Sequence, residues 1–503
     1  MNNSVLKWLE GTSERFPEKT AIVDENGSIS FVEYRNKALA IARNIIQLLD
    51  GNTKKPVVVY LEKGIDVLVS FMGIAYSGCF YSPLDIDMPK ARANKILEVL
   101  NPKIVITSEK LRASFEQLQF DGEILIYDSI ISKKDDNKIV SPYLERIVDT
   151  DLLYVLFTSG STGIPKGVSI CHRSVIDYID WVSETFEIDE QDSFGNQAPF
   201  YFDNSILDIY TTIKTGATLY IIPKKLFFQP VLLLEYLRDN NINSIFWVPS
   251  ALIIVSKLKA FRNVDLSNTL KRVLFCGEVM PNKQLNVWRK YLPNITYANL
   301  YGPTEITDAC TYYIVDREFS DDEPLPIGFP MKNTDILVLN DHNEKVSGDE
   351  VGELCVRGTS LALGYYNNPE KTQEAFIQNP LNQAFPEIIY RTGDLVKYNK
   401  YGELIYLSRK DFQIKHLGHR IELGEIETAV SSLDEISLCC CLYDEKQHRI
   451  VLFIDVNLEK NYIRNRLESM IPNYMIPEKV VYVGTMPINA NGKIDRVKLK
   501  ELI

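Results

Sequence analysis

Apolar and polar residues follow one another along this chain in blocks that predict alternating strands and helices. PVVVYLEK, from Pro56, is an apolar run of strand length, and IDVLVSFMGIAYSG after it has the spacing of a helix. KIVITS, from Lys103, and LLYVLF, from Leu152, are further strands of this kind. Strands that alternate with helices indicate βαβ units around a largely parallel sheet.

The pattern changes after Asp335. Short runs broken by Gly and Asn, namely DILVLND, GELCVRG and GELIYLS, predict a β-rich subdomain beside the α/β part. The last stretch indicates a strand, a helix, an antiparallel pair around Asp444 to His448, a helix and a closing strand, as in a small α+β domain. We predict an α/β fold with a large N-terminal domain over 1–408 and a small mobile domain over 409–503.

Composition excludes several classes of protein. The 503 residues are too many for one core, and the net charge of −12 argues against nucleic acid or an anionic membrane as the main partner. Apolar runs stay below the roughly 18 residues of a membrane helix, and the first residues do not resemble a secretory signal, so we expect a cytoplasmic protein. The eight cysteines form no CxxC pair, which leaves zinc and disulfides poorly supported. Three of them stand in SLCCCLY, a predicted strand.

A run of small residues follows the strand that starts at Leu152. Its glycines permit positive φ, so N–H groups can turn inward as an anion-binding nest, and Lys166 adds a positive charge. Gly167 departs from the spacing GxxxxGK[ST], and a Ser/Thr/Gly surface loop is the alternative. We interpret the run as a polyphosphate site made of Thr158, Ser159, Gly160, Ser161, Thr162 and Gly163.

Four predicted strands end in polar or glycine-rich turns. In open α/β sheets, ligands bind beyond the carboxyl ends of the strands. We therefore expect the strand ends at Phe157, Val248, Phe275 and Leu300 to face one crevice.

Ten segments in a fixed order make the chain similar to a known superfamily. They are SFVEY, YSPLD, FTSGSTGIPKG, FDNS, NLYGPTE, GELCVRG, YRTGDL, RKDFQIKHLGHRIELGEIE, IPNYMIP and NGKIDR. The chain resembles the acyl- and aminoacyl-adenylate-forming enzymes, specifically amino-acid adenylation domains such as those of nonribosomal peptide synthetases. NQAPF and FCGEV add a nearer resemblance to stand-alone ligases that load D-alanine onto a small carrier protein. Because the chain stops soon after NGKIDR, a phosphopantetheinylated carrier protein is expected in trans.

The resemblance implies an AMP-forming ligase that uses ATP and Mg²⁺. An amino-acid carboxylate would attack the α-phosphorus of ATP, with Lys493 as the catalytic lysine and Glu305 as the metal ligand. In isolation, Asn491-Gly492 before this lysine would indicate an ordinary hairpin turn. Besides the loop and Lys166, the ATP-binding residues implied by the resemblance are Gly277, Glu278, Asn299, Tyr301, Gly302, Thr304, Asp394, Arg409 and Lys493.

The resemblance also implies a pocket for the amino acid. Asp203 would bind the ammonium group, because an acid among apolar residues is costly unless it is paired. Trp247 would fill much of the volume and favour a compact substrate. Asp308 would either prefer a cationic or hydrogen-bonding side chain, or point away and hold the turn after Glu305. The positions beside Asp203 are Asn204, Leu207, Trp247, Leu274, Cys276, Leu300, Asp308 and Ala309.

A two-step reaction with one hinge follows from the same resemblance. Asp411 would be the hinge residue, and rotation would withdraw Lys493 and bring the segment from Lys415 to Gly418 toward the active site. There this segment would line a tunnel for the phosphopantetheine thiol. Ser408 stands where the family often has Gly, and KHLG where it often has KIRG.

Three alternatives stay open from the sequence. D-alanine is the leading substrate, but another small polar, basic or β-amino acid used in natural-product biosynthesis is possible. An acyl-CoA synthetase shares the fold, and Asp203 argues against it because fatty acids carry no ammonium. A non-catalytic ATP-binding homologue is disfavoured because Lys493, Glu305 and the full TSGSTGIPKG loop are retained.

Overall fold

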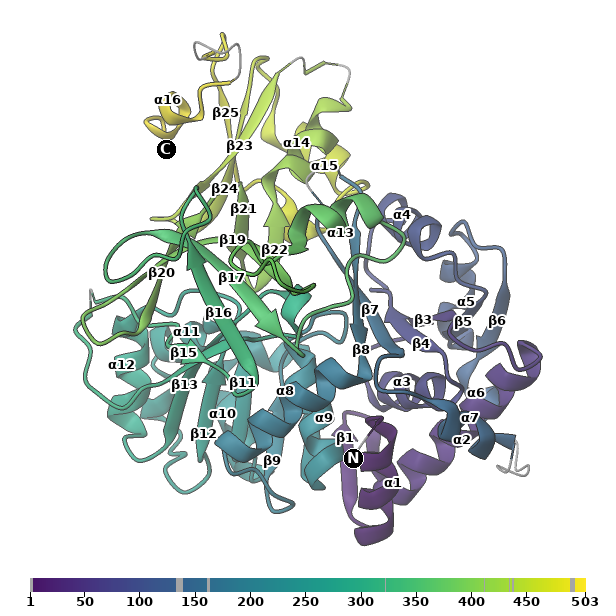
Figure 1. Cartoon of the computed structure of the whole chain (residues 1–503). Helices are drawn as coiled ribbons and strands as arrows, with labels where there is room; N and C mark the ends of the chain where they lie inside the picture. Colours follow the sequence, from purple (N-terminus) through teal and green to yellow (C-terminus); the bar gives the residue numbers. More distant parts are fainter. Residues whose placement is uncertain are drawn as a thin grey trace.

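The computed structural model describes residues 3–132, 139–160, 163–321, 323–410, 412–433, 435–436, 438–488 and 494–503. Figure 1 shows a large body formed by the purple, blue and teal parts of the chain, with a smaller yellow-green part standing on it. The predicted α/β fold, with its β-rich part and its small C-terminal part, is confirmed. The border at residue 408 stays a prediction.

The first large sheet has six strands in the order β6-β5-β3-β4-β7-β8. Its pairs are parallel, apart from the antiparallel pair of β7 and β8. The strands predicted from Pro56, Lys103 and Leu152 are confirmed as members of this sheet. Its strands are β3 (Pro56–Tyr60), β4 (Phe80–Pro83), β5 (Ile104–Thr107), β6 (Glu123–Ile126), β7 (Leu152–Thr158) and β8 (Lys166–Cys171).

The second large sheet has nine strands in the order β15-β14-β13-β12-β11-β9-β10-β1-β2. Its centre, from β13 to β1, is parallel, and antiparallel strands close both edges. The strands are β1 (Thr20–Asp24), β2 (Gly27–Ser30), β9 (Ser193–Asn196), β10 (Thr218–Ile221), β11 (Ser244–Trp247), β12 (Arg272–Phe275), β13 (Thr296–Tyr301), β14 (Thr311–Ile314) and β15 (Phe329–Pro330).

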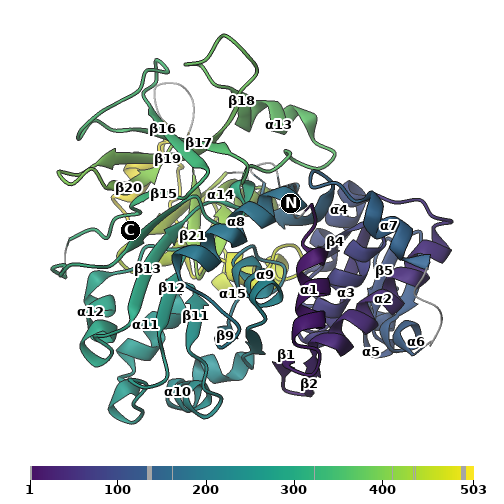
Figure 2. The same ribbon diagram turned by 60° about the horizontal axis from the view of Figure 1, so that its bottom comes forward.

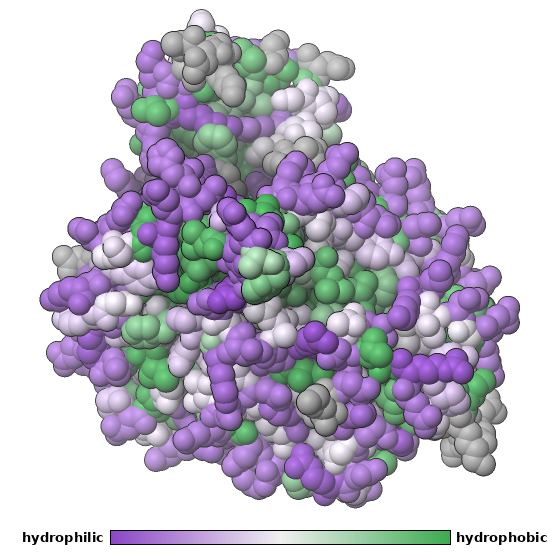
Figure 3. Space-filling model, viewed as in Figure 1, coloured by the Kyte–Doolittle hydropathy of each residue, from purple (hydrophilic) through white to green (hydrophobic). Residues whose placement is uncertain are grey.

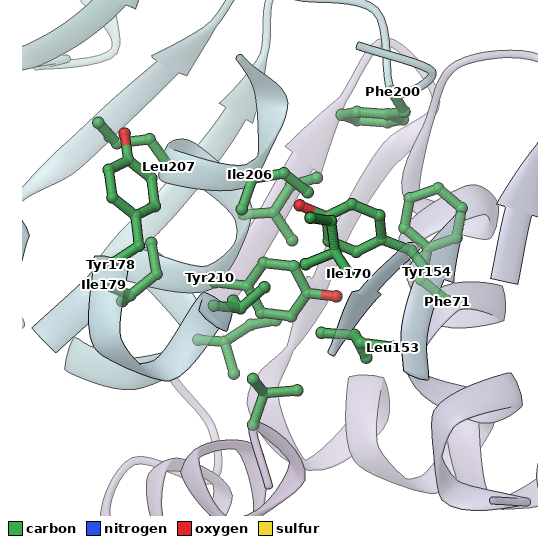
Figure 4. Packing of buried hydrophobic residues seen from close by; sticks show 14 of the residues in the cluster. Phe71, Leu153, Tyr154, Ile170, Tyr178, Ile179, Phe200, Ile206, Leu207 and Tyr210 are labelled. Atoms are coloured by element: carbon green, nitrogen blue, oxygen red, sulfur yellow. The ribbon is translucent and has the colours of Figure 1, made fainter. Parts of the chain in front are cut away.

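One hydrophobic core joins the two large sheets. It takes side chains from both sheets and from the helices between them, as Figure 4 shows for Phe71, Tyr154, Ile206 and Tyr210. Figure 2 shows these helices between the teal and the blue strands. The core helices are α1 (Leu6–Arg15), α2 (Phe31–Leu48), α3 (Ile65–Tyr76), α8 (His172–Thr185) and α9 (Ser205–Thr215).

The outer face of each sheet has its own helices and its own core. The six-stranded sheet packs against α4 (Lys90–Leu100) and α5 (Glu109–Phe115). The nine-stranded sheet packs against α10 (Pro230–Asp239), α11 (Pro249–Lys257) and α12 (Asn282–Tyr291). The short helices α6 (Tyr127–Ile131) and α7 (Ser141–Arg146) lie beside the first sheet in Figure 1.

The β-rich part is a five-stranded antiparallel sheet. Its order is β16-β17-β19-β18, with β20 paired to β19. The predicted strands DILVLND, GELCVRG and GELIYLS are confirmed as β16, β17 and β20. The elements are β16 (Thr334–Leu339), β17 (Gly352–Gly358), α13 (Pro369–Ala375), β18 (Phe376–Gln378), β19 (Ile388–Tyr398) and β20 (Leu404–Arg409).

The C-terminal part has its own hydrophobic core. Two details differ from the prediction: its first strand is a hairpin of two strands, and a helix follows the closing strand. The triple cysteine lies in a strand, as predicted, and all eight cysteines are free and buried. The elements are β21 (Gln413–His416), β22 (His419–Glu422), α14 (Leu423–Ser431), β23 (Cys439–Asp444), β24 (Arg449–Ile454), α15 (Lys460–Leu467), β25 (Lys479–Tyr482) and α16 (Arg496–Lys500).

The surface is mostly hydrophilic in the view of Figure 3, with scattered hydrophobic residues. Within the described residues, no helix is long and apolar enough to span a bilayer.

Candidate active site

The β21–β22 hairpin docks where the two large sheets meet. Its turn residues Leu417 and Gly418 both have positive φ, of 52° and 80°. A Cβ atom at Gly418 would lie 2.9 Å from Val248 Cγ1, so the close approach requires glycine. The Gly418 N–H donates to Glu278 Oε1 at 2.8 Å, just beyond the end of β12.

The predicted strand ends meet at this hairpin, but they do not come from one sheet. The strand that ends near Phe157 belongs to the six-stranded sheet, whereas those ending near Val248, Phe275 and Leu300 belong to the nine-stranded sheet. The four strand ends expected to face one crevice therefore lie at a junction between two sheets.

The glycine-rich loop after β7 contacts the same hairpin. The Ser159 hydroxyl donates to the Arg420 carbonyl at 2.9 Å and accepts from the Glu422 N–H at 3.0 Å. Gly163 has a φ of 73°, and a Cβ at Gly160 would lie 2.1 Å from the Ile164 carbonyl oxygen. Both glycines are thus required by the backbone, the first by its conformation and the second by lack of space.

Two polar groups beside this loop stand out. The Thr158 hydroxyl is buried and has no hydrogen-bond partner in the described part of the chain. The Lys166 ammonium lies 3.6 Å from Glu422 and 5.3 Å from the Tyr365 ring centre. Burial lowers the pKa of Lys166, although acids nearby oppose this. The loop therefore offers an unused donor and a cation held close to it.

Glu305 is completely buried at the centre of the junction. The Tyr365 hydroxyl donates to its Oε1 at 2.7 Å, and the Arg420 guanidinium of the hairpin bonds its Oε2. Burial opposes the charge of Glu305, but Arg420 and Lys166 outweigh it and lower the pKa to about 2. The carboxylate is thus ionised, with both oxygens engaged by the protein.

The same carboxylate fits Mg²⁺ only in part. Among the residues that the structure describes, no three His, Cys, Asp or Glu side chains gather as a metal site. A single carboxylate suits a Mg²⁺ ion that arrives with phosphate oxygens and keeps several waters. For Glu305 Oε2 to take part, Arg420 has to move away, because it occupies that oxygen here.

Three of the predicted ATP-binding residues, Tyr301, Asp394 and Arg409, lie together. The Tyr301 hydroxyl donates to Asp394 Oδ2, and Arg409 Nη1 bonds Asp394 Oδ1 at 2.6 Å. The Lys415 ammonium, on the hairpin, lies 5.2 Å from the Tyr301 ring centre as a cation–π contact. In this arrangement a cation of the protein covers the ring of a residue predicted to bind ATP.

Asp203 precedes α9 and faces the same region. Its Oδ1 accepts the Asn204 N–H at 3.0 Å, and the Thr304 side chain hydrogen-bonds the carboxyl. Burial raises the pKa of Asp203, and the Thr304 bond and the Lys415 ammonium partly offset this. The side chain is therefore an acid whose ionised form gains from a cation.

Asp308 is buried in the same region, with only 1% of its surface exposed. The Tyr178 hydroxyl, on α8, donates to its Oδ2 at 2.7 Å, while its Oδ1 has no partner within the described residues. Burial and the charge of Asp203 raise the pKa of Asp308 well above its usual value. Both acids also raise the pKa of the Cys276 thiol, after burial itself.

The apolar pocket positions share one core. Leu207, Leu274, Cys276, Leu300 and Ala309 are all buried in the cluster between the large sheets.

Trp247 does not belong to this wall. It packs in the cluster on the opposite face of the nine-stranded sheet, and its indole N–H donates to the Gly195 carbonyl at 2.8 Å. Neighbouring residues of a strand point to opposite faces, and Phe246, paired with Leu274, lies in the shared core. The prediction that Trp247 limits the pocket is wrong, and Phe246 is the residue of β11 on that side.

The remaining predicted residues fall into two groups. Gly277, with a φ of 95°, has the Asn204 amide beside it. A Cβ at Gly302 would lie 2.5 Å from Ala309 Cα, and the Asn299 amide donates to the Pro326 carbonyl. Four predictions lie outside the described residues, namely Ser161, Thr162, Asp411 and Lys493.

Four residues at this junction were missed from the sequence. Arg420, Tyr365, Phe246 and Tyr178 each touch or neighbour a predicted site residue. Arg420 stood inside a segment already singled out, but no local signal pairs it with Glu305. Tyr178 lies in an ordinary amphipathic helix, and no local signal distinguishes it.

Comparison with known proteins agrees with this geometry. Residues 9–366 match the family described as AMP-binding enzyme. A D-alanine–D-alanyl carrier protein ligase of Bacillus cytotoxicus is 32% identical over 507 residues, which cover 98% of each chain. Tyrocidine synthase 1 of Brevibacillus parabrevis is 31% identical over 503 residues, and here the match covers 99% of this chain but only 45% of the relative.

A solved structure shows the shared fold. The adenylation domain AlmE of Vibrio cholerae, in complex with glycyl-adenosine-5'-phosphate, superimposes with a TM-score of 0.82 at 21% identity, over 100% of this chain and 98% of that one. The chain therefore belongs to the AMP-binding enzymes, as an AMP-forming ligase close to the D-alanine–D-alanyl carrier protein ligases and to the adenylation domains of nonribosomal peptide synthetases.

Proposed function

We propose that this enzyme activates a small amino acid with ATP and transfers it to the phosphopantetheine thiol of a separate carrier protein. One observation carries the proposal: Asp203, Glu305, Tyr301 and the loop at Ser159 converge on one hairpin-filled junction. D-alanine is the first substrate to test, because a ligase named for it matches along nearly the whole chain.

The chemistry assigns each side of the junction a task. Asp203 holds the substrate ammonium, and the loop with Lys166 receives the phosphates. Lys493 approaches the carboxylate and the α-phosphate, where charge develops in the transition state. Glu305 would hold Mg²⁺, which when bound would supply charge neutralisation to the ATP phosphates. The free thiols of all eight cysteines suit a reducing compartment, and we keep the cytoplasm as the proposed location.

The hairpin position supports a second step. With Lys415 over Tyr301 and Arg420 on Glu305, the hairpin stands where ATP and its metal would interact with the protein. Rotation about Asp411 would withdraw it and admit Lys493 for adenylation. The present arrangement would then correspond to thioester transfer or to a resting state. The assignment of the docked hairpin to a separate orientation is supported by the positive φ of Gly418 and by its close contact with Val248. Together they define a specific docked turn.

Lys493→Ala tests the adenylation step. We expect amino-acid-dependent pyrophosphate exchange to fall by at least about a hundredfold, since one contact aimed at transition-state charge is worth several kcal/mol. Lys498→Ala is the matched control, because Lys498 is an exposed lysine on nearby α16. Pyrophosphate exchange at the wild-type rate in the Lys493→Ala variant would refute the catalytic role of Lys493. Comparable turnover of propionate and alanine by the wild type would refute the role of Asp203 in binding the substrate ammonium.

A further inference from the structure

Asp308 and Tyr178 form a buried polar pair that the steps above do not use. Tyr178 comes from α8 and Asp308 from the turn after Glu305, so the two lie 130 residues apart in the chain. Tyr178 belongs to the same buried cluster as Leu207, a predicted pocket residue, and Figure 4 shows both side chains. The hydrogen bond holds one carboxylate oxygen, and Oδ1 is left without a partner among the described residues.

The backbone holds Asp308 in an unusual conformation. Thr307 and Asp308 both have positive φ, of 60° and 74°, which is costly for residues that carry a Cβ. The Thr307 hydroxyl donates to the Ser360 carbonyl at 2.7 Å, and the Cys310 N–H donates to the Tyr301 carbonyl at 2.8 Å. These bonds hold the turn that places the carboxyl among the buried residues of the predicted pocket.

Among the residues that the structure describes, the core around Asp308 supplies no cation of its own. Leu207, Cys276 and Ala309 of the surrounding core offer no charge, and Asp203 adds a second negative charge. Lys415 is the cation that acts on both acids, and it enters on the hairpin. When the hairpin withdraws in the proposed cycle, two buried acids remain without it. A buried carboxylate with a free oxygen costs free energy until a donor reaches it.

We propose that Asp308, positioned by Tyr178, binds a hydrogen-bond donor on the substrate side chain, and that this donor is an amino group. The substrate class is then a short diamino acid: one ammonium pairs with Asp203 and the second with Asp308 Oδ1. This inference rests on the proposed function and specifies its substrate. Tyr178 is a positioning residue, since it touches the carboxylate and not the substrate.

The experiment compares pyrophosphate exchange with diaminopropionate, serine, asparagine and alanine, each in both enantiomers. For the wild type we expect kcat/KM for diaminopropionate to exceed that for alanine by about a hundredfold, since a site built around a polar group rejects the analogue lacking its partner. Asp308→Asn keeps the shape and removes the charge, and it is expected to abolish most of this ratio. Tyr178→Phe is expected to lower it several-fold, mainly through KM for diaminopropionate.

A control variant on the same helix accompanies the experiment. Asp180→Asn, on the same helix with a half-exposed carboxyl, is expected to leave the ratio unchanged. A wild type that prefers alanine or asparagine, or an unchanged ratio in Asp308→Asn, overturns the inference. If no amino acid stimulates exchange, the proposed function fails. If Asp308→Asn does not fold, the inference is tested by thermal shift on the wild type. Diaminopropionate then has to raise the melting temperature more than alanine does, and an equal or smaller rise overturns the inference.

Discussion

Glu305 and Asp308 are buried acids three residues apart, and their surroundings shift their pKa values in opposite directions. Glu305 has an arginine and a tyrosine on its two oxygens, and its pKa falls to about 2. Asp308 has a tyrosine on one oxygen and, among the described residues, no partner on the other, and its pKa rises. Burial disfavours charge in both cases, so the difference lies in the partners. The protein neutralises Glu305 through its own hairpin, whereas it leaves Asp308 for a ligand.

The largest expected effect comes from Arg420→Met, which removes the cation from Glu305. Removing one partner of a buried ion pair costs about 3–5 kcal/mol, so the docked hairpin loses at least a hundredfold in population. Thioester transfer from a preformed adenylate should fall accordingly, and pyrophosphate exchange much less. Arg464→Met, at an exposed pair on α15, serves as the control. Equal loss in both half-reactions would contradict the assignment of this pair to the docked orientation.

Glu305→Gln and Asp308→Asn should change stability in opposite directions. The first leaves Arg420 buried without its full charge partner and should lower the free energy of unfolding of the ligand-free protein by about 3 kcal/mol. The second removes an uncompensated acid and should raise it by about 1 kcal/mol. Urea unfolding measures both changes. Loss of stability in both variants would mean that Asp308 is as well compensated as Glu305.

Their pH dependence sharpens the same test. The pKa of Glu305 is lowered, so its contribution is present above about pH 4.5 and is lost as pH falls toward 2. The pKa of Asp308 is raised, so its contribution is most favourable when it is protonated and is lost as pH rises. The difference in free energy of unfolding between the wild type and Asp308→Asn, measured with urea, should therefore increase as pH rises.

The smallest effect concerns His419 of the hairpin, which stacks on Tyr474 at 3.5 Å between ring centres and meets Phe202 edge-on. Burial lowers its pKa from 6.5 to about 3, so the docked hairpin favours the neutral ring. Docking is then intact above pH 6.5 and weakens as pH falls, by about fourfold at pH 6. Energy transfer between fluorescent labels on α4 and α15 would measure the docked fraction as a function of pH. The His419→Phe variant should lack this pH dependence.

The local sequence pattern was sufficient to predict most helices and strands and to single out the motif residues. Apolar runs such as the one from Pro56 have strand length and apolar character within a few residues, and these elements were predicted correctly. The strand around Trp247 shows where this fails. All four residues of β11 are buried, so hydrophobicity does not alternate, and the sequence carries no signal for which side each residue faces.

The sequence by itself determined the main elements and singled out candidate residues for the chemistry, because a glycine loop, an acid before a helix and a GHRIELGEIE segment are local features. Only the tertiary structure decided their partners. Arg420 meets Glu305 across 115 residues and Tyr178 meets Asp308 across 130, and neither separation has a period that a sequence reveals. The charge state of a buried acid depends on such partners, so the contrast between Glu305 and Asp308 arises only when the chain has folded.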